Sequence, residues 1–276
     1  MVSIATIAEK ANAGEPVTMV NAYDSSMAGL VDRSDVEIIL VGDSVGLTTL
    51  GYDSTSRVSI EEMIHHAAAV TRVVEETPIV VDLPFGSYNV TSTDAVRNAN
   101  RLRKDGRADA IKLEGGREVA ECVAAITEGG IPVIGYIGVT PQMTTVGDDP
   151  LRGRTATEAG SIRDDAIALD EAGAVGTVLE LVTTTAASAV TEAIDGMTIG
   201  IGAGSGCNAQ VVTLHDLLGL GEVLPETAAG IGTDLGTAIV EHLNGFHGAV
   251  ASGEFPDGNA TEPMAEDEAD DFARDT

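Results

Sequence analysis

Short apolar runs recur along the chain and alternate with segments of helical spacing. Each run is rich in β-branched residues and bounded by turn residues, a pattern that indicates buried strands. The runs lie within residues 17–24, 37–44, 77–85, 108–116, 131–138, 174–182, 197–204 and 209–216, and the last is the weakest. The segments between them, such as residues 59–76 and 161–173, are rich in Ala and charged residues. The first of these begins with a capping box, Ser59 and Glu62, which predicts a helix start.

Strands that alternate with helices are typical of a parallel sheet. Eight such units in 276 residues favour a closed (βα)8 barrel of the TIM type over an open doubly wound sheet. A helix over residues 3–13 precedes the first strand, where it could close the bottom of the barrel. We therefore expect an α/β protein with one catalytic domain over residues 1–251.

The composition changes from Ser252 onward. The segment is acidic and nearly free of large apolar residues. Such a composition predicts a disordered tail over residues 252–276.

The charge excludes several classes of partner. The chain carries a net charge of −29 with only three lysines, which disfavours binding to nucleic acids and anionic membranes. One interpretation is a soluble protein with a strongly solvated surface, and a sharper one is adaptation to concentrated salt.

The N-terminus lacks a signal-type apolar core, and no apolar stretch reaches the roughly 20 residues of a membrane span. We expect a cytoplasmic protein. Two cysteines make no disulfide framework and no zinc pattern.

Four of the predicted strands end in a carboxylate: Asp43, Asp82, Glu114 and Glu180. A single acid in this position is often a helix N-cap or a loop residue. In a parallel barrel, however, all strand C-termini lie on the face that holds the active site, so these acids should converge. Asp43, Asp82 and Glu114 together would repel each other and need a cation. Oxygen ligands without nearby histidine or cysteine favour Mg²⁺ over zinc.

Lys112 strengthens this interpretation. It lies two residues before Glu114 on the same predicted strand, so both side chains point to one face. A lysine inside a barrel is improbable as packing, but it would suit an anionic substrate. His65 and His66 lie within a predicted helix, and we interpret them as surface or packing residues.

Six motifs give the chain a resemblance to a known family. In order, they are "VGDSVGLTTLGYDST", "VDLPFGSY", "IKLEGG", "IGVTPQ", "VLE" and "IGIGAGSGCNAQVVTLHDLLGL". Together they resemble ketopantoate hydroxymethyltransferase (3-methyl-2-oxobutanoate hydroxymethyltransferase) and cover roughly residues 18–220. The resemblance implies a (βα)8 barrel that transfers a hydroxymethyl group from 5,10-methylenetetrahydrofolate to 3-methyl-2-oxobutanoate, giving 2-dehydropantoate for pantothenate and coenzyme A biosynthesis. It also implies a homo-oligomer.

By match to the motifs, the resemblance implies roles for individual residues. Asp43, Asp82 and Glu114 would surround Mg²⁺, with Glu114 acting through water. The residues that would bind the oxoacid are Asp43, Ser44, Asp82 and Lys112. Glu180 would be the catalytic proton acceptor. Positions 52, 136, 183 and 208–209 depart from the family pattern, with Tyr52, Tyr136, Thr183 and Asn208-Ala209 in place of the usual residues.

Three other interpretations remain open at the level of sequence. The protein could be another metal-dependent oxoacid lyase or aldolase on a similar barrel. It could be a phosphate-binding barrel in which the glycine-rich residues 200–206 hold the ligand. It could also be a binding barrel without catalytic activity, because fold alone does not imply activity.

Stability should rise steeply as salt goes from millimolar to molar. The 44 acidic and 15 basic side chains concentrate negative charge on the folded surface. The Debye length falls from roughly 30 Å at 0.01 M to roughly 3 Å at 1 M, which confines the repulsion to nearest neighbours. Mg²⁺ should add stability separately because it binds only the folded site. Thermal unfolding across KCl concentrations, with and without Mg²⁺, measures both effects. A melting temperature that stays flat or falls with KCl would contradict adaptation to salt.

Overall fold

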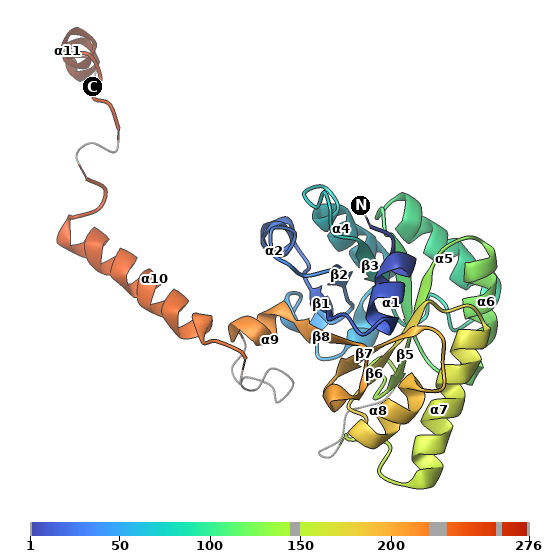
Figure 1. Cartoon of the computed structure of the whole chain (residues 1–276). Helices are drawn as coiled ribbons and strands as arrows, with labels where there is room; N and C mark the ends of the chain where they lie inside the picture. Colours follow the sequence, from blue (N-terminus) through green and yellow to red (C-terminus); the bar gives the residue numbers. More distant parts are fainter. Residues whose placement is uncertain (1, 144–149, 221–230, 258–260, 275–276) are drawn as a thin grey trace.

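The eight predicted strands form a closed parallel barrel in this computed structural model (Figure 1). Each strand pairs with the next, and β8 closes the barrel against β1. The structure describes residues 2–143, 150–220, 231–257 and 261–274. The strands are β1 (Val17–Asn21), β2 (Ile38–Val41), β3 (Ile79–Asp82), β4 (Ala110–Glu114), β5 (Val133–Gly138), β6 (Gly176–Glu180), β7 (Met197–Ile201) and β8 (Ala209–Thr213).

Helices cover the outside of the barrel, as the alternating pattern predicts (Figure 1). The α-helices are α1 (Ile4–Asn12), α2 (Ser25–Val31), α3 (Val45–Thr48), α4 (Ile60–Val70), α5 (Ser92–Lys104), α6 (Ala120–Glu128), α7 (Ala156–Glu171), α8 (Thr184–Thr191), α9 (Leu214–Leu218), α10 (Leu235–Ser252) and α11 (Glu266–Arg274). The 3₁₀ helices are η1 (Thr55–Arg57), η2 (Arg117–Val119) and η3 (Gly204–Gly206).

The start of α4 confirms the predicted capping box, but its end differs from the prediction. Ser59 and Glu62 each bond to the backbone N–H of the other. The helix ends at Val70, six residues before the end of the predicted segment. The backbone N–H groups of residues 75–77 donate instead to the Asp32 carboxylate, at 2.9–3.3 Å, so they are not available to continue the helix.

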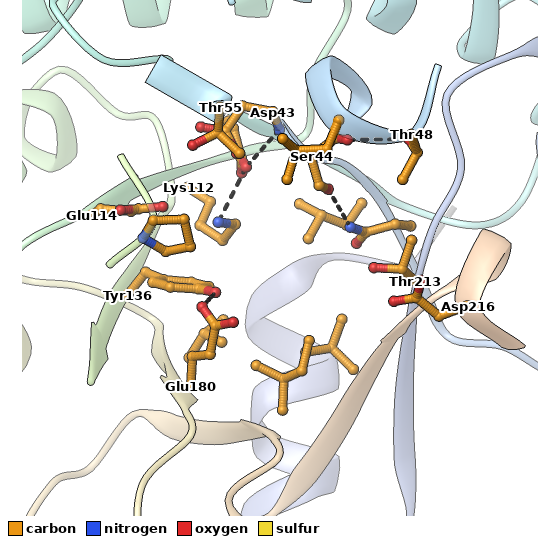
Figure 2. Close-up of a pocket in the computed structure, with 18 residues that line it drawn as sticks. Asp43, Ser44, Thr48, Thr55, Lys112, Glu114, Tyr136, Glu180, Thr213 and Asp216 are labelled. Carbon is orange, nitrogen blue, oxygen red and sulfur yellow. Dashed lines mark hydrogen bonds and ion pairs between the residues drawn. The ribbon is translucent and has the colours of Figure 1, made fainter. Parts of the chain in front are cut away.

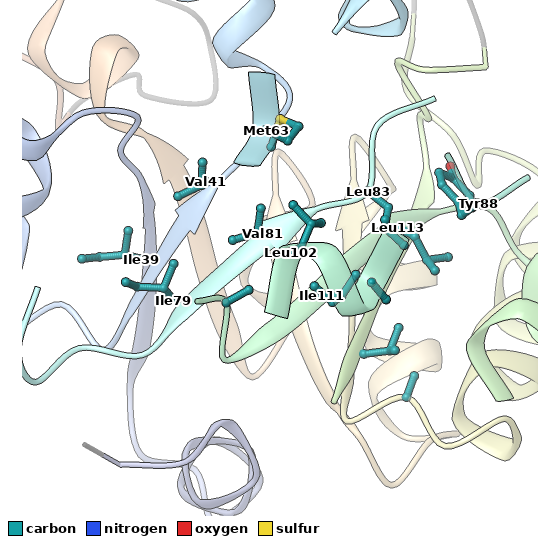
Figure 3. Packing of buried hydrophobic residues seen from close by; sticks show 14 of the residues in the cluster. Ile39, Val41, Met63, Ile79, Val81, Leu83, Tyr88, Leu102, Ile111 and Leu113 are labelled. Carbon is teal, nitrogen blue, oxygen red and sulfur yellow. The ribbon is translucent and has the colours of Figure 1, made fainter. Parts of the chain in front are cut away.

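Alternate residues of each strand belong to two different layers. Outward-facing residues such as Ile39, Val81 and Leu113 form one apolar cluster with residues of the covering helices, among them Met63 of α4 and Leu102 of α5 (Figure 3). The second set faces the barrel interior, in a separate cluster that includes Met19, Leu40, Val80, Ala110, Ile134, Val178, Ile199 and Val211. This alternation decides which strand-end side chains reach the inside of the barrel mouth.

The N-terminal helix closes the other end of the barrel, as predicted. Ile4 and Ile7 of α1 belong to the interior cluster. Lys10 pairs with Glu37, just before β2, at 2.8 Å, and Asn12 donates to the carbonyl of Asp195, just before β7, at 2.7 Å. Both contacts lie where strands begin, so α1 covers the end opposite to the strand C-termini.

Helix α9 follows β8 directly and stays in contact with the barrel. Helix α10 projects away from it, and α11 lies farther out (Figure 1). The sequence pattern did not predict α11, which lies inside the segment expected to be disordered. The division into a catalytic domain (1–251) and a tail (252–276) stays a prediction. None of the described helices is long and apolar enough to span a bilayer.

Candidate functional site

A cavity of about 400 Å³ opens at the mouth where the strands end (Figure 2). Most of the polar residues of its wall are strand residues whose side chains face the barrel interior. It is lined by Asn21, Leu40, Asp43, Ser44, Leu47, Thr48, Thr55, Asp82, Lys112, Glu114, Tyr136, Pro141, Val178, Glu180, Ile201, Val211, Thr213 and Asp216. Every site residue predicted from the sequence is among them, so the structure brings all six together.

Asp43, Asp82 and Lys112 form the buried centre of this wall. Asp82 Oδ2 accepts from Lys112 Nζ at 3.1 Å and from the backbone N–H of Asp43 at 3.0 Å. All three residues are at most 5 % exposed. Burial, and then the charge of Asp82, raises the pKa of Asp43 to about 7. Burial lowers the pKa of Lys112, but the surrounding carboxylates outweigh this effect and raise it overall, so the lysine stays charged.

Gln142 links two of the acids. Its side-chain amide donates to Asp43 Oδ2 at 2.6 Å, and its backbone N–H donates to Glu114 Oε2 at 3.0 Å. The hydroxyl of Tyr88 donates to the Gln142 side chain at 2.7 Å, which fixes the orientation of the amide. Burial, with the charge of Asp43, raises the pKa of Glu114 to about 9. Neither Gln142 nor Tyr88 was predicted as a site residue, although Gln142 ends the motif "IGVTPQ".

Glu180 lies on another part of the wall, next to Tyr136. The Tyr136 hydroxyl donates to Glu180 Oε2, and its ring centre lies 4.0 Å from Lys112 Nζ (Figure 2). Burial raises the pKa of Glu180, while the hydrogen bond from Tyr136 and the charge of Lys112 partly oppose that rise. One aromatic ring therefore contacts both the lysine and the acid.

The backbone between β5 and β6 makes this pairing possible. A Cβ at Gly138 would lie 2.3 Å from the carbonyl oxygen of Glu180, and Gly138 has φ +97°. Only glycine fits such an approach without displacing the strand. Leu181, directly after Glu180, adopts the left-handed region with φ +49° and donates its N–H to Ile201 at 2.9 Å. Strain of this kind at a non-glycine residue is common at functional sites.

The acid cluster has the chemistry of a magnesium site. No group of three or more His, Cys, Asp or Glu side chains among the described residues forms a ready metal cage. Mg²⁺, however, usually binds through one or two carboxylates, with water and substrate oxygens completing its shell. Asp82 Oδ1 is buried and has no hydrogen-bond partner. A cation beside Asp43 and Asp82 would satisfy that oxygen and favour the charged forms of the neighbouring carboxyl groups.

Only one of the departures from the family pattern lies on the described cavity wall, namely Tyr136. Tyr52 donates to Glu62 of α4 at 2.5 Å. Asn208 accepts from both the backbone and the side chain of Thr198, which ties the loop before β8 to β7. Thr183 donates its N–H to the carbonyl of Arg152 at 2.9 Å, a bond that proline could not make. These three residues thus bond to neighbouring segments of the chain and do not line the described cavity.

The glycine-rich run gives no support to the phosphate-binding interpretation. A Cβ at Gly204 would lie 2.2 Å from the Thr184 hydroxyl, and one at Gly206 would lie 2.6 Å from the Ser188 hydroxyl. Both hydroxyls belong to α8, against which the run packs. The glycines therefore serve close packing of the chain on itself.

Comparison with known proteins gives the same picture as the motifs. The model of the family described as ketopantoate hydroxymethyltransferase matches residues 1–258. The chain is 48% identical over 256 residues to the 3-methyl-2-oxobutanoate hydroxymethyltransferase of Ignicoccus hospitalis, covering 92% of this chain and 97% of that protein. It is 45% identical over 244 residues to the protein of the same name from Heliobacterium modesticaldum, covering 88% of each.

Solved structures confirm the fold. The chain is similar to the phosphoenolpyruvate phosphomutase of Streptomyces platensis subsp. rosaceus, with a TM-score of 0.62 and 13% identity over 99% of this chain and 98% of that one. At this identity the similarity concerns the barrel and not the reaction.

Asp82→Asn should weaken Mg²⁺ binding by at least about 10-fold, because changes around metal ligands already cost about 10- to 100-fold in affinity. Calorimetric titration with Mg²⁺ in molar KCl measures the site while screening diffuse binding to the acidic surface. Asp164→Asn, an exposed change on α7, is the matched control. Equal Mg²⁺ affinity in both variants would remove Asp82 from the metal site.

Proposed function

The chain belongs to the ketopantoate hydroxymethyltransferase family, and on this premise we propose how its cavity makes 2-dehydropantoate from 3-methyl-2-oxobutanoate. The protein is a one-carbon transferase of pantothenate biosynthesis. The donor is 5,10-methylenetetrahydrofolate. The observation that carries the proposal is that a buried base, Glu180, shares one cavity with Lys112 and the Asp43–Asp82 pair.

Family membership removes two of the alternatives left open by the sequence. A barrel without catalytic activity and a different oxoacid lyase would both share the acid cluster. The relatives named above are hydroxymethyltransferases, and the chain matches most of the length of each.

The oxoacid binds where the positive charge is concentrated. Lys112 supplies a buried ammonium group, and Ser44 supplies a hydroxyl at the edge of the same wall. Tyr23 and Asn21 both bond to the Ser44 oxygen, at 2.7 and 3.0 Å, and so hold the hydroxyl in position. Asp43 and Asp82 would repel an anion by themselves, so a cation held by these two residues would offset their charge when the oxoacid binds.

Asp43 and Asp82 would hold Mg²⁺ directly, with Glu114 acting through water. When bound, the ion would supply positive charge that stabilises the enolate formed from the oxoacid. Gln142 keeps the Asp43 and Glu114 carboxylates apart and correctly turned, because it donates to both.

Glu180 removes the proton from C3 of the oxoacid. Burial makes its carboxylate a stronger base than one in water, which suits proton abstraction next to a carbonyl. Tyr136 holds Oε2, leaving Oε1 to accept the proton. Lys112 opposes the negative charge that develops on the keto oxygen. The carbon nucleophile formed in this way attacks the one-carbon unit of the donor and forms the new C–C bond. The two C–N bonds that held this unit break, one water molecule supplies the hydroxyl oxygen, and tetrahydrofolate leaves with N5 and N10 protonated.

Three properties stay predictions: a homo-oligomeric assembly, a cytoplasmic location and adaptation to concentrated salt. Helix α10 carries an exposed apolar row that would suit an assembly. Its members are Leu235, Ile239, Val240, Leu243, Phe246 and Val250.

Glu180→Gln should keep the fold and oxoacid binding while lowering turnover by about 10²- to 10⁴-fold, the usual cost of losing a general base. Exchange of the C3 proton of 3-methyl-2-oxobutanoate for deuterium in D₂O, with Mg²⁺ and without donor, measures proton removal by Glu180 separately from the transfer step. Glu171→Gln, at the exposed end of α7, is the control. Exchange at the wild-type rate in Glu180→Gln would show that another group is the base.

Tyr136→Phe should move the acidic limb of the pH profile of kcat/KM to higher pH. The lost hydrogen bond stabilised the charged form of Glu180, so its pKa rises and the base is ionised only in a more alkaline range. Tyr52→Phe removes a comparable phenol–carboxylate bond, that to Glu62, outside the cavity and should leave the limb in place. An unshifted limb in Tyr136→Phe would mean that this tyrosine does not tune the base.

A further inference from the structure

One part of the cavity wall has no role in the chemistry of the oxoacid. Thr213 at the end of β8 and Asp216 on α9 line the cavity on the side away from Lys112, Glu114 and Tyr136 (Figure 2). Asp216 is half-buried. An anionic substrate that already lies beside four carboxyl groups would avoid a further one that Lys112 does not face, so we expect this part of the wall to face a different ligand.

Asp216 lacks a cationic partner within the part of the chain that the structure describes. Its neighbour His215 does not supply one, because burial lowers the pKa of that imidazole and favours its neutral form. Burial also raises the pKa of Asp216, and the hydrogen bond from the Thr213 side chain offsets only part of this rise. A desolvated carboxylate on an open cavity wall is stabilised by a ligand that brings N–H donors to it.

Asn21 points to a ligand independently. It is only 7 % exposed, and its Nδ2 donates to Ser44 at 3.0 Å and to Tyr23 at 3.3 Å. The other polar end of this amide, Oδ1, has no partner, although the residue lines the cavity. A buried amide oxygen rarely stays unpaired, so it also requires a donor from a bound molecule.

The remaining wall suits a flat, partly apolar ring. Leu47, Ile201 and Val211 line the same cavity, and Leu47 is 47 % exposed at its rim. Cavities of roughly 300–1,000 Å³ hold ligands of drug size, so 400 Å³ leaves space beyond a five-carbon oxoacid. That space must admit the one-carbon carrier for its carbon to reach the nucleophile.

We propose that Asp216, together with Asn21, forms the subsite that recognises the 2-amino-4-oxopyrimidine edge of the one-carbon donor. This inference rests on the proposed function. The N3–H and 2-amino groups of that edge lie side by side and donate in parallel to one carboxylate, as the guanidinium of arginine does. The same edge occurs in folates and related pterins, so the subsite reads the ring and not the tail of the donor.

Calorimetric binding of tetrahydrofolate to the full chain, with Mg²⁺ and 3-methyl-2-oxobutanoate present, tests this subsite. Asp216→Asn should weaken binding by about 10- to 100-fold, the range expected when a charge-assisted pair of hydrogen bonds is lost. In steady-state kinetics the KM for the donor should rise by a similar factor, and the KM for the oxoacid should change far less. Asp35→Asn, exposed just before β2 at the far end of the barrel, is the matched control.

A tetrahydrofolate analogue with methyl in place of the 2-amino group gives a second measurement that needs no variant. The wild-type protein should bind it at least about 10-fold more weakly than tetrahydrofolate. Asp216→Asn should discriminate much less between the two. Equal binding of both compounds by the wild type, or wild-type donor affinity in Asp216→Asn, would overturn the subsite. Failure of the wild type to exchange the C3 proton without donor would instead overturn the proposed function.

Discussion

The structure of the mouth depends on one constraint, a surplus of buried carboxyl groups around a single buried lysine. Lys112 pairs with Asp82 at 3.1 Å, while Asp43, Glu114 and Glu180 line the same cavity. Breaking a buried pair of this kind is costly, because it leaves a charge without compensation. The neighbouring polar groups, Gln142 above all, are placed to keep carboxylates apart that would otherwise repel. The site is therefore built to receive positive charge together with its substrate.

Much of this arrangement could be predicted from the sequence. The apolar runs predicted eight strands in the correct order. The position of an acid at the end of a run placed four acids at one mouth, namely Asp43, Asp82, Glu114 and Glu180. Lys112 could be assigned to the interior because it lies two residues before Glu114. These predictions depend only on the spacing of apolar residues and on the parallel direction of the strands. In a closed barrel these two properties bring the C-terminal ends of all strands to the same face.

Other features could not be predicted, because they depend on contacts between distant segments. Gln142 reaches Asp43 across 99 positions of the sequence, and Tyr88 reaches Gln142 across 54. Nothing near Asn21 or Asp216 in the sequence distinguishes them from ordinary polar residues at strand ends. The end of α4 was also missed, since Asp32 binds the following backbone from 43 to 45 residues away. The short helix α11 has no apolar run that would have indicated it.

The two-layer alternation of the strands has a consequence for how such a protein can diverge. Ile111 and Leu113 face the helices, while Lys112 and Glu114 between and after them face the cavity. Neighbouring positions of a strand are thus under different constraints, because one side chain must pack against helices and the next must serve the cavity. Substitutions in the outer layer can therefore accumulate without affecting the reaction. Tyr136, which departs from the family pattern, is a substitution on the cavity side of a strand. Insertion or deletion of one residue within a strand exchanges the two sets. Strand length should therefore drift far less than strand composition.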